Sequence, residues 1–292
     1  MDGECQLHKD IEKKFRPSNL ILGQVDFINC LPINLPLELN EVSIDAEIIK
    51  GVPSKLNNLI LSEQVDIAPV SSYAYISNKN KLTPIGNLCI ASNGPADSVL
   101  LFSHFPIEEL DGAKIALSSA SATSNKLLEI LFKGFLKVKA ELCIPEQGSN
   151  EPIASLVSRE YSALLLIGDN ALLEYSKMPR DLFIYDLGSL WKKYTGLPMV
   201  FGIWVVRNEA FKSHQEKIYD IANKLMTSKE LGLGSMFDRV VKKAQEKVLI
   251  SKDFYSMYFQ HLSYDLTSDF IKGLNTFEEY CNKLTKPTPI LS

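Results

Sequence analysis

The sequence lacks the short motifs that bind nucleotides, hold zinc or activate a serine. Its closest pair of glycines, Gly232 and Gly234, has no third glycine and no preceding strand, and neither a G-x-x-x-x-G-K-[ST] nor a G-x-S-x-G segment occurs. The five cysteines are scattered without a C-x-x-C pair, and the four histidines stand alone in their segments. Such cysteines are typical of reduced, buried thiols. We therefore expect no metal and no organic cofactor, and nothing supports a Ser/His hydrolase.

A charge excess of one sign and long apolar runs are also missing. The formal net charge is −4, and no run of Lys and Arg with interleaved aromatics occurs, so we expect neither nucleic acid nor membrane as a partner. No apolar run reaches the roughly 18 residues that a membrane-spanning helix needs. Residues 1–17 are polar and lack the apolar core of a secretory signal. The expected location is the cytoplasm, with residues 1–17 as an N-terminal extension.

The sequence does contain strand-to-helix transitions rich in small polar residues. Short apolar strands end in polar residues that open a helix at 65–75 and 163–173, and the segment 116–132 has the same character. Ligands of open α/β sheets bind beyond the carboxyl ends of strands, and the free N–H groups at a helix start attract anions. These segments therefore predict a pocket for a small anionic molecule.

The alternation of strands and helices over 292 residues favours an α/β protein with two lobes, because a domain commonly holds about 100–150 residues. A single doubly wound sheet is the alternative that the pattern leaves open. A break near Pro106 and a long apolar run at 199–206 mark the crossings between the lobes. We predict that lobe 1 comprises 18–106 and 203–292, and lobe 2 comprises 107–202.

Two helix starts supply the predicted substrate-binding donors. Ser71 and Ser72 stand where a cap residue belongs, and Ala122 and Thr123 follow a serine-rich turn. Hydroxyls and backbone N–H groups at such positions are preorganised, whereas lysine side chains are flexible. We expect these four residues to contact the anion.

Four further polar residues have two interpretations each. The Asn29 amide orients a ligand or satisfies turn backbone groups. Ser98 begins an apolar strand, where its hydroxyl faces the pocket or binds a neighbouring carbonyl. Thr195 in YTGLP and Asp169 in IGDN pose the same choice, and helix capping is the favoured alternative for Asp169. All four are candidate site residues.

An ordered set of segments between about residues 20 and 285 resembles the chorismate dehydratases of the futalosine route to menaquinone. It covers nearly the whole chain and is far more specific than one short motif. That family often has tyrosine at Phe27, glutamate at Ala74 and aspartate at Asn93, and these departures concern the shape of the pocket. The matching segments are GQVDFINCLPI, GVPSKLNNLI, VDIAPVSS, SNGPADSVLLFS, PIEELDGAKIAL, SATS, IGDNAL, DLGSLWKKYTGLPMVFGIWVV and SYDLTSDFIKGLNTF.

The resemblance implies the two-lobed fold of type II periplasmic binding proteins and an enzyme, a hydro-lyase that removes water from chorismate to give 3-[(1-carboxyvinyl)oxy]benzoate. The family's catalytic asparagine falls on Asn29 in the N-C-L-P motif, and its catalytic serine falls on Ser98 in the G-P-x-x-S-V-L-L motif. Neither motif holds a His or Lys, so the substrate's side-chain carboxylate is the expected proton acceptor. The alternatives are the 1,4-dihydroxy-6-naphthoate synthase of the same route and a non-catalytic solute-binding protein, and the oligomeric state stays open.

Overall fold

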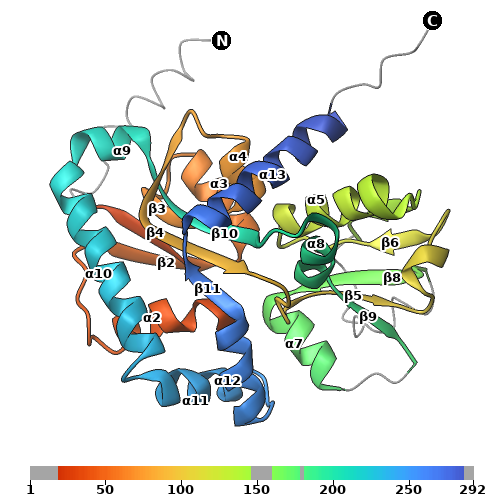
Figure 1. The fold of residues 1–292 in the computed structure, drawn as a ribbon. Helices are drawn as coiled ribbons and strands as arrows, with labels where there is room; N and C mark the ends of the chain where they lie inside the picture. The colour runs from red at the N-terminus through yellow and green to blue at the C-terminus, as the bar shows by residue number, and fades with distance from the viewer. Residues whose placement is uncertain (1–18, 146–159, 178–180, 286–292) are drawn as a thin grey trace, which may run out of the picture.

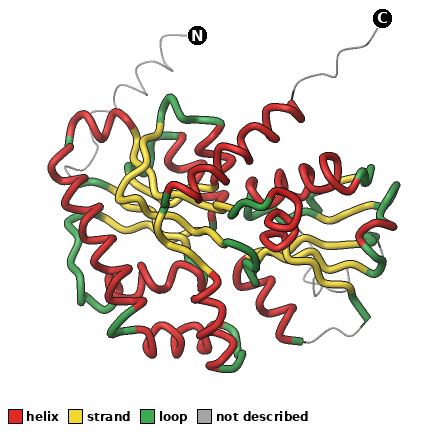
Figure 2. Tube along the Cα trace, in the orientation of Figure 1, coloured by secondary structure: helices red, strands yellow, loops and turns green. Residues whose placement is uncertain are grey.

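The computed structural model describes residues 19–145, 160–177 and 181–285. The predicted extension, residues 1–17, lies outside the described residues. Figure 1 shows two lobes, each built on its own β-sheet with helices packed around it, and Figure 2 shows the strands of both sheets running toward the junction of the lobes. This two-lobed α/β arrangement confirms the predicted fold class and replaces the single doubly wound sheet.

The first lobe contains a mixed sheet. Strands β2, β1 and β3 are parallel to one another, whereas β10 runs antiparallel to β3 and β4, and β11 runs antiparallel to β4. Within the described residues the sheet has six strands, in the order β11 (Leu262–Asp265), β4 (Leu82–Ser92), β10 (Met199–Arg207), β3 (Ile67–Ser71), β1 (Ile21–Val25) and β2 (Glu47–Gly51).

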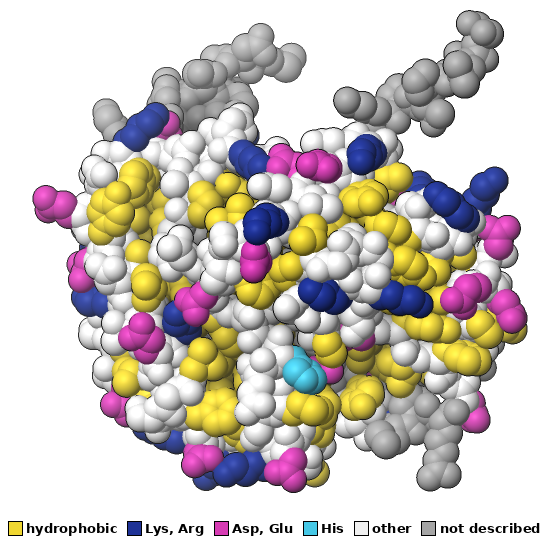
Figure 3. All heavy atoms as spheres, viewed as in Figure 1, with side chains coloured by type: hydrophobic (Ala, Val, Ile, Leu, Met, Phe, Trp, Pro, Cys, Tyr) yellow, Lys and Arg dark blue, Asp and Glu magenta, His cyan; other side chains and the backbone are white. Residues whose placement is uncertain are grey.

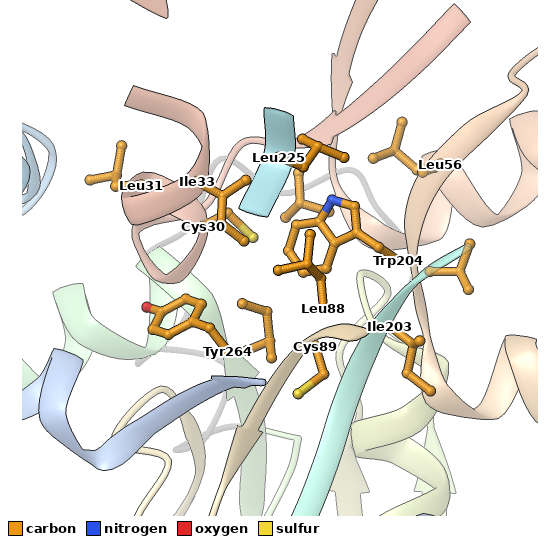
Figure 4. Packing of buried hydrophobic residues seen from close by; sticks show 14 of the residues in the cluster. Cys30, Leu31, Ile33, Leu56, Leu88, Cys89, Ile203, Trp204, Leu225 and Tyr264 are labelled. Carbon is orange, nitrogen blue, oxygen red and sulfur yellow. The ribbon is translucent and has the colours of Figure 1, made fainter. Parts of the chain in front are cut away.

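The central strands of this sheet are near-continuous apolar runs because helices cover both of their faces. Every residue of β3 is buried, and so are most residues of β10. Figure 4 shows Trp204 of β10 surrounded by Leu88, Ile33 and Leu225, which come from a strand and two helices far apart in the sequence. This core holds the strand ends that face the second lobe in fixed positions.

The second lobe contains a smaller sheet. Strand β8 is parallel to β6 and antiparallel to β5, and β5 is antiparallel to β9. In the described part of the chain the order is β7 (Glu141–Cys143), β6 (Lys114–Ala116), β8 (Ala163–Ile167), β5 (Val99–Ser103) and β9 (Phe183–Asp186). Its core is separate from that of the first lobe and centres on Trp191, which is fully buried.

Within the described residues, two connections carry the chain between the two sheets, and the first lies earlier than the sequence pattern predicts. The chain leaves the first sheet after β4 and enters the second directly at β5, so Val99–Ser103 belongs to the second sheet and not to lobe 1. It returns before β10, whose first residue Met199 pairs with Ser92. The apolar run SVLLFS fits either core equally well, and only its pairing with β8 and β9 assigns it to the second sheet.

The helices cover the faces of both sheets. Helix α13 runs from the first lobe across to the second, where Phe277 and Cys281 join the core around Trp191. The described helices are η1 (Ile28–Cys30), α2 (Leu31–Glu38), α3 (Pro53–Leu61), α4 (Ser72–Ile76), η2 (Ile107–Glu109), α5 (Ala122–Ile130), η3 (Leu131–Leu136), α7 (Gly168–Ser176), α8 (Leu187–Thr195), α9 (Asn208–Ser213), α10 (Gln215–Leu233), α11 (Phe237–Lys247), α12 (Lys252–His261) and α13 (Ser268–Thr285).

Charged side chains of both signs are interspersed over the face seen in Figure 3, as expected for a net charge of −4. Within 19–145, 160–177 and 181–285, no helix is long and apolar enough to cross a membrane.

Candidate functional site

The candidate site is a cavity between the lobes, called here the interlobe cavity. Its empty volume is about 540 Å³, part of it open to solvent. Strand ends and helix starts of both sheets form its walls, as the sequence pattern predicts. It is lined by Val25, Phe27, Asn29, Cys30, Pro53, Pro69, Val70, Ser71, Ile90, Ser98, Val99, Ser121, Ser124, Ile167, Gly168, Phe201 and Gly202.

Asn29 enters the cavity from the short helix η1. Its backbone carbonyl accepts a hydrogen bond from the hydroxyl of Tyr264 at 2.9 Å, but its side-chain oxygen Oδ1 is buried and has no partner among the described residues. The other such buried atoms belong to Gln24 and Asn125, which do not line the cavity. An unpaired buried oxygen costs about 1–3 kcal/mol. At a cavity wall, this oxygen is free to accept a hydrogen bond from a molecule in the cavity.

The Asn29 segment is held in place by a residue of the second lobe. The backbone N–H of Ile28 donates to Oδ1 of Asp169 at 2.7 Å, and Lys247 pairs with Asp169 at 2.9 Å and with Asp26 at 3.0 Å. Burial lowers the pKa of Lys247, but the hydrogen bonds and charges of Asp169 and Asp26 outweigh it and raise that pKa. Asp169 therefore fixes the backbone beside Asn29 and does not itself line the cavity.

Ser98 lies where the chain enters β5, and its hydroxyl is almost fully buried. The Oγ atom accepts a hydrogen bond from the hydroxyl of Tyr258 at 3.0 Å and donates to the carbonyl of Ala96 at 3.2 Å. Burial raises the pKa of Tyr258 well above its ordinary value. The two interpretations of Ser98 are therefore both correct: its hydroxyl binds a neighbouring carbonyl, and the residue also lines the cavity.

A carboxylate anchors the loop that precedes Ser98. Asp186 caps helix α8, and it accepts hydrogen bonds from the N–H groups of Ala96 at 3.0 Å, Asp97 at 2.7 Å and Ser189 at 2.8 Å. Burial raises the pKa of Asp186, and these three N–H groups act in the opposite direction. Asp186 is not among the residues predicted from the sequence, although the D-L-G-S spacing after a strand is a capping signal.

Ser71 reaches the cavity as predicted, from the end of β3. Its Oγ accepts from the side-chain N–H of Asn57 at 3.1 Å and from the N–H of Ala74 at 3.4 Å. The N–H of Ser71 donates to Oδ1 of Asn57 at 3.0 Å. Since Oγ acts as the acceptor in both of its contacts, the hydroxyl proton of Ser71 can be donated to a ligand.

The serine-rich turn contributes different residues from those predicted. Ser121 and Ser124 line the cavity, and Oγ of Ser121 accepts from the N–H of Ser124 at 3.2 Å. Thr123 is instead fully buried and accepts from the N–H of Tyr73 at 2.9 Å, while Ala122 lines a separate surface groove. The segment SSASATS has several small polar residues in a row, so the rotation of the helix decides which ones line the cavity.

Two other predicted residues lie away from the cavity. The hydroxyl of Ser72 is fully buried and donates to the carbonyl of Val200 at 2.7 Å. The hydroxyl of Thr195 donates to the carbonyl of Trp191 at 2.7 Å near the end of α8. Neither of them is among the lining residues. Both hydroxyls donate to backbone carbonyls, which for Thr195 is the alternative interpretation of its position.

The cavity is lined mostly by apolar side chains, with a few neutral polar groups among them. None of the described residues that line it is Lys, Arg, His, Asp or Glu. The thiol of Cys30 is buried, and burial raises its pKa far above the ordinary value, so Cys30 stays a protonated thiol at neutral pH. The described residues contain no group of three His, Cys, Asp or Glu side chains that could hold a metal ion. Hydrogen bonding is thus the chemistry that these lining side chains offer.

Solved structures of binding proteins share this fold. The alkanesulfonate-binding protein SsuA from Xanthomonas axonopodis pv. citri, bound to MOPS, matches with a TM-score of 0.64 and 12% identity, over 93% of this chain and 96% of that one. The likeness establishes the periplasmic-binding-protein-like fold.

Curated relatives match over most of the sequence. A chorismate dehydratase from Thermus thermophilus is 28% identical over 89% of this chain and 94% of its own length. A chorismate dehydratase from Campylobacter jejuni is 30% identical over 62% of this chain and 65% of its own length. The family described as menaquinone biosynthesis matches residues 20–283. This chain therefore belongs to the menaquinone biosynthesis family.

Proposed function

We propose that this protein is a chorismate dehydratase, a hydro-lyase that eliminates water from chorismate to give 3-[(1-carboxyvinyl)oxy]benzoate. One observation carries the proposal: Asn29, with a buried and unpaired side-chain oxygen, lines the same cavity as Ser98. The relatives that carry this name support it, since they match most of the chain. The alternative naphthoate synthase has no comparable support.

The reaction suits a cavity lined by neutral groups. The proton leaves the ring carbon that bears the enolpyruvyl ether, its bonding electrons enter the ring, and the hydroxyl leaves the neighbouring carbon with the electrons of the C–O bond. The ring becomes aromatic, so much of the driving force lies in the substrate. The substrate's side-chain carboxylate accepts the proton, and the proton and the hydroxyl together form the released water. Asn29 and Ser98 hold the reactive conformer and support the departing hydroxyl.

Chorismate carries two carboxylates, and neutral hydrogen-bond donors bind this dianion. The hydroxyls of Ser71, Ser121 and Ser124 line the cavity, and the last two lie at the start of α5, where free N–H groups favour negative charge. Charge-assisted hydrogen bonds contribute about 1.5–3 kcal/mol each, so about four to six of them supply roughly 6–18 kcal/mol. Micromolar binding needs about 8 kcal/mol after the costs of association. Neutral donors suffice if they are preorganised, as these helix starts are.

The test is to mix purified protein with chorismate and to follow the ultraviolet spectrum and the product mass. We expect loss of one water and appearance of a substituted benzoate. Asn29→Ala and Ser98→Ala should each lower kcat by about 10²–10³, the usual value of a positioned donor. Thr195→Val is the matched control, since it removes a hydroxyl outside the cavity and should leave kcat unchanged.

Two outcomes would contradict the proposal. Binding of chorismate without conversion would favour a solute-binding protein. Turnover within a factor of two of wild type in both the Asn29→Ala and the Ser98→Ala variants would remove these residues from the reaction.

A further inference from the structure

Behind Ser98 lies a tyrosine that does not itself reach the cavity. Tyr258 of helix α12 is fully buried, and its hydroxyl donates to Oγ of Ser98 at 3.0 Å across 160 positions of sequence. It is absent from the lining residues of the interlobe cavity. Any effect of Tyr258 on a bound molecule therefore passes through Ser98.

The direction of these hydrogen bonds determines what Ser98 can do. Burial raises the pKa of Tyr258 well above its ordinary value, so the phenol keeps its proton and donates it. A hydroxyl has one proton and can accept at its lone pairs, so Ser98, which accepts from Tyr258, has its own proton left to donate. Its acceptor in the structure is the carbonyl of Ala96 at 3.2 Å, a long contact for two oxygens. A ligand oxygen in the cavity can take the place of that carbonyl.

Helix α12 also contacts Asp97, the residue before Ser98. His261 lies one turn after Tyr258 on the same face of the helix, and its Nδ1 contacts Oδ2 of Asp97 at 2.6 Å. Asp97 has a φ of 54°, in the left-handed region. Contacts to two consecutive loop residues fix Ser98 with respect to α12, so the Tyr258 hydroxyl acts on a serine that is held in place.

We infer that Tyr258 is a positioning residue that commits Ser98 to donate its hydroxyl proton toward the departing oxygen of the substrate. This inference rests on the proposed dehydration. As the C–O bond breaks, negative charge grows on that oxygen and the Ser98 hydrogen bond strengthens. The Tyr258 hydrogen bond strengthens with it, because consecutive hydrogen bonds polarise one another. Ser98 and Tyr258 both keep their protons when the water leaves.

Helix α12 offers a matched pair of variants. Tyr255 is fully buried like Tyr258, but its hydroxyl donates to the carbonyl of Val248 at 2.7 Å, away from the cavity. Phenylalanine preserves the aromatic packing at both positions, including the stacking of Tyr258 on Phe254. We expect Tyr258→Phe to lower kcat for chorismate about tenfold, the value of one neutral hydrogen bond, with KM changed by less than about twofold. Tyr255→Phe should keep the wild-type kcat, and circular dichroism checks that both variants fold.

A double variant separates positioning from general stability. The double variant Tyr258→Phe with Ser98→Ala should have the same kcat as Ser98→Ala alone, because the Tyr258 hydroxyl then has no serine to orient. An equal drop in kcat for Tyr255→Phe, an undiminished kcat for Tyr258→Phe, or full additivity with Ser98→Ala would each overturn the inference. Failure of the wild-type protein to convert chorismate would instead overturn the proposed function, so the two failures are distinguishable.

Discussion

Among single residues, the two proposed catalytic side chains differ in their hydrogen bonding before a ligand binds. Asn29 has its backbone fixed by Tyr264 while its side-chain oxygen is left without a partner among the described residues. Ser98 is already hydrogen-bonded to Tyr258 and Ala96. An unpaired buried acceptor costs stability, so Asn29 gains most from the arrival of a ligand. When a ligand binds, the Ser98 hydroxyl instead exchanges the carbonyl of Ala96 for a ligand oxygen as its acceptor.

The first residue-scale prediction concerns Gly188, which packs against the loop before Ser98. A Cβ at this position would lie 2.5 Å from the carbonyl oxygen of Gly94 and 2.8 Å from Oγ of Ser92. Because the Gly94 atom is backbone, Gly188→Ala should displace the loop, lower the free energy of unfolding by about 1–3 kcal/mol and reduce kcat. Urea unfolding and steady-state kinetics measure the two effects.

Gly134 is the matched control for that substitution. It lies in η3, and a Cβ there would meet no atom closer than 3.9 Å. Gly134→Ala should leave kcat unchanged and raise stability by roughly 0.5–1 kcal/mol, since alanine loses less backbone entropy in a helix. If Gly188→Ala behaved like Gly134→Ala, the tight packing of the loop would not matter for catalysis.

Among the individual elements, helix α5 packs one face into the core of the second lobe and has a second role at its start. Leu127 and Leu128 of α5 are fully buried in the second core, and so is Leu131, with which η3 begins. The N-cap of α5, Ser121, both satisfies the N–H of Ser124 and lines the interlobe cavity. One residue thus stabilises the helix and lines the cavity.

This double role leads to a prediction for Ser121→Ala. Loss of the cap should lower the free energy of unfolding by about 1 kcal/mol, and loss of a donor should raise KM for chorismate several-fold. Ser251 is the control, because it caps α12 by accepting from the N–H of Phe254 at 3.2 Å and does not line the cavity. Ser251→Ala should cost similar stability and leave KM unchanged. A rise of KM in both variants would show that stability alone controls binding.

At the scale of the whole molecule, the cavity exists only because the two lobes are held together. Phe27 of the first lobe packs against Gly168 of the second, where a Cβ would lie 2.8 Å from the ring. Lys247 joins Asp26 on the first lobe to Asp169 on the second. The lobes therefore meet through an aromatic contact and an ion-pair bridge on one side of the cavity.

Removing this bridge should weaken substrate binding and leave the chemistry intact. Partly exposed ion pairs contribute about 0.2–1 kcal/mol each, so we expect Lys247→Met to raise KM about two- to fivefold with little change in kcat. Lys252→Met is the control, since Lys252 pairs with Asp238 within the first lobe at 2.8 Å. Steady-state kinetics in low and high salt provide the measurement, and added salt should raise the KM of the wild type more than that of Lys247→Met. Equal KM values for both variants would contradict a role for the bridge in closure.

Local features could be predicted without the structure: the alternating strands and helices, the helix starts at Ser71 and in SSASATS, and the segments that resemble one family. These depend on residues close together in the chain, and so does the presence of Asn29 and Ser98 at strand ends. The tertiary structure decided which of these groups meet. The contact of Tyr258 with Ser98 and that of Ile28 with Asp169 join residues 160 and 141 positions apart.

The same reason explains the assignments that the sequence pattern missed. Val99–Ser103 is apolar on both faces, so it fits a central position in either sheet, and the packing of the lobes selects the second. Ser121 and Ser124 line the cavity because of the rotation of α5 against α4, where Thr123 accepts a hydrogen bond from the N–H of Tyr73. Local periodicity sets which face of an element is apolar, but the partner of that face depends on the packing of the whole chain.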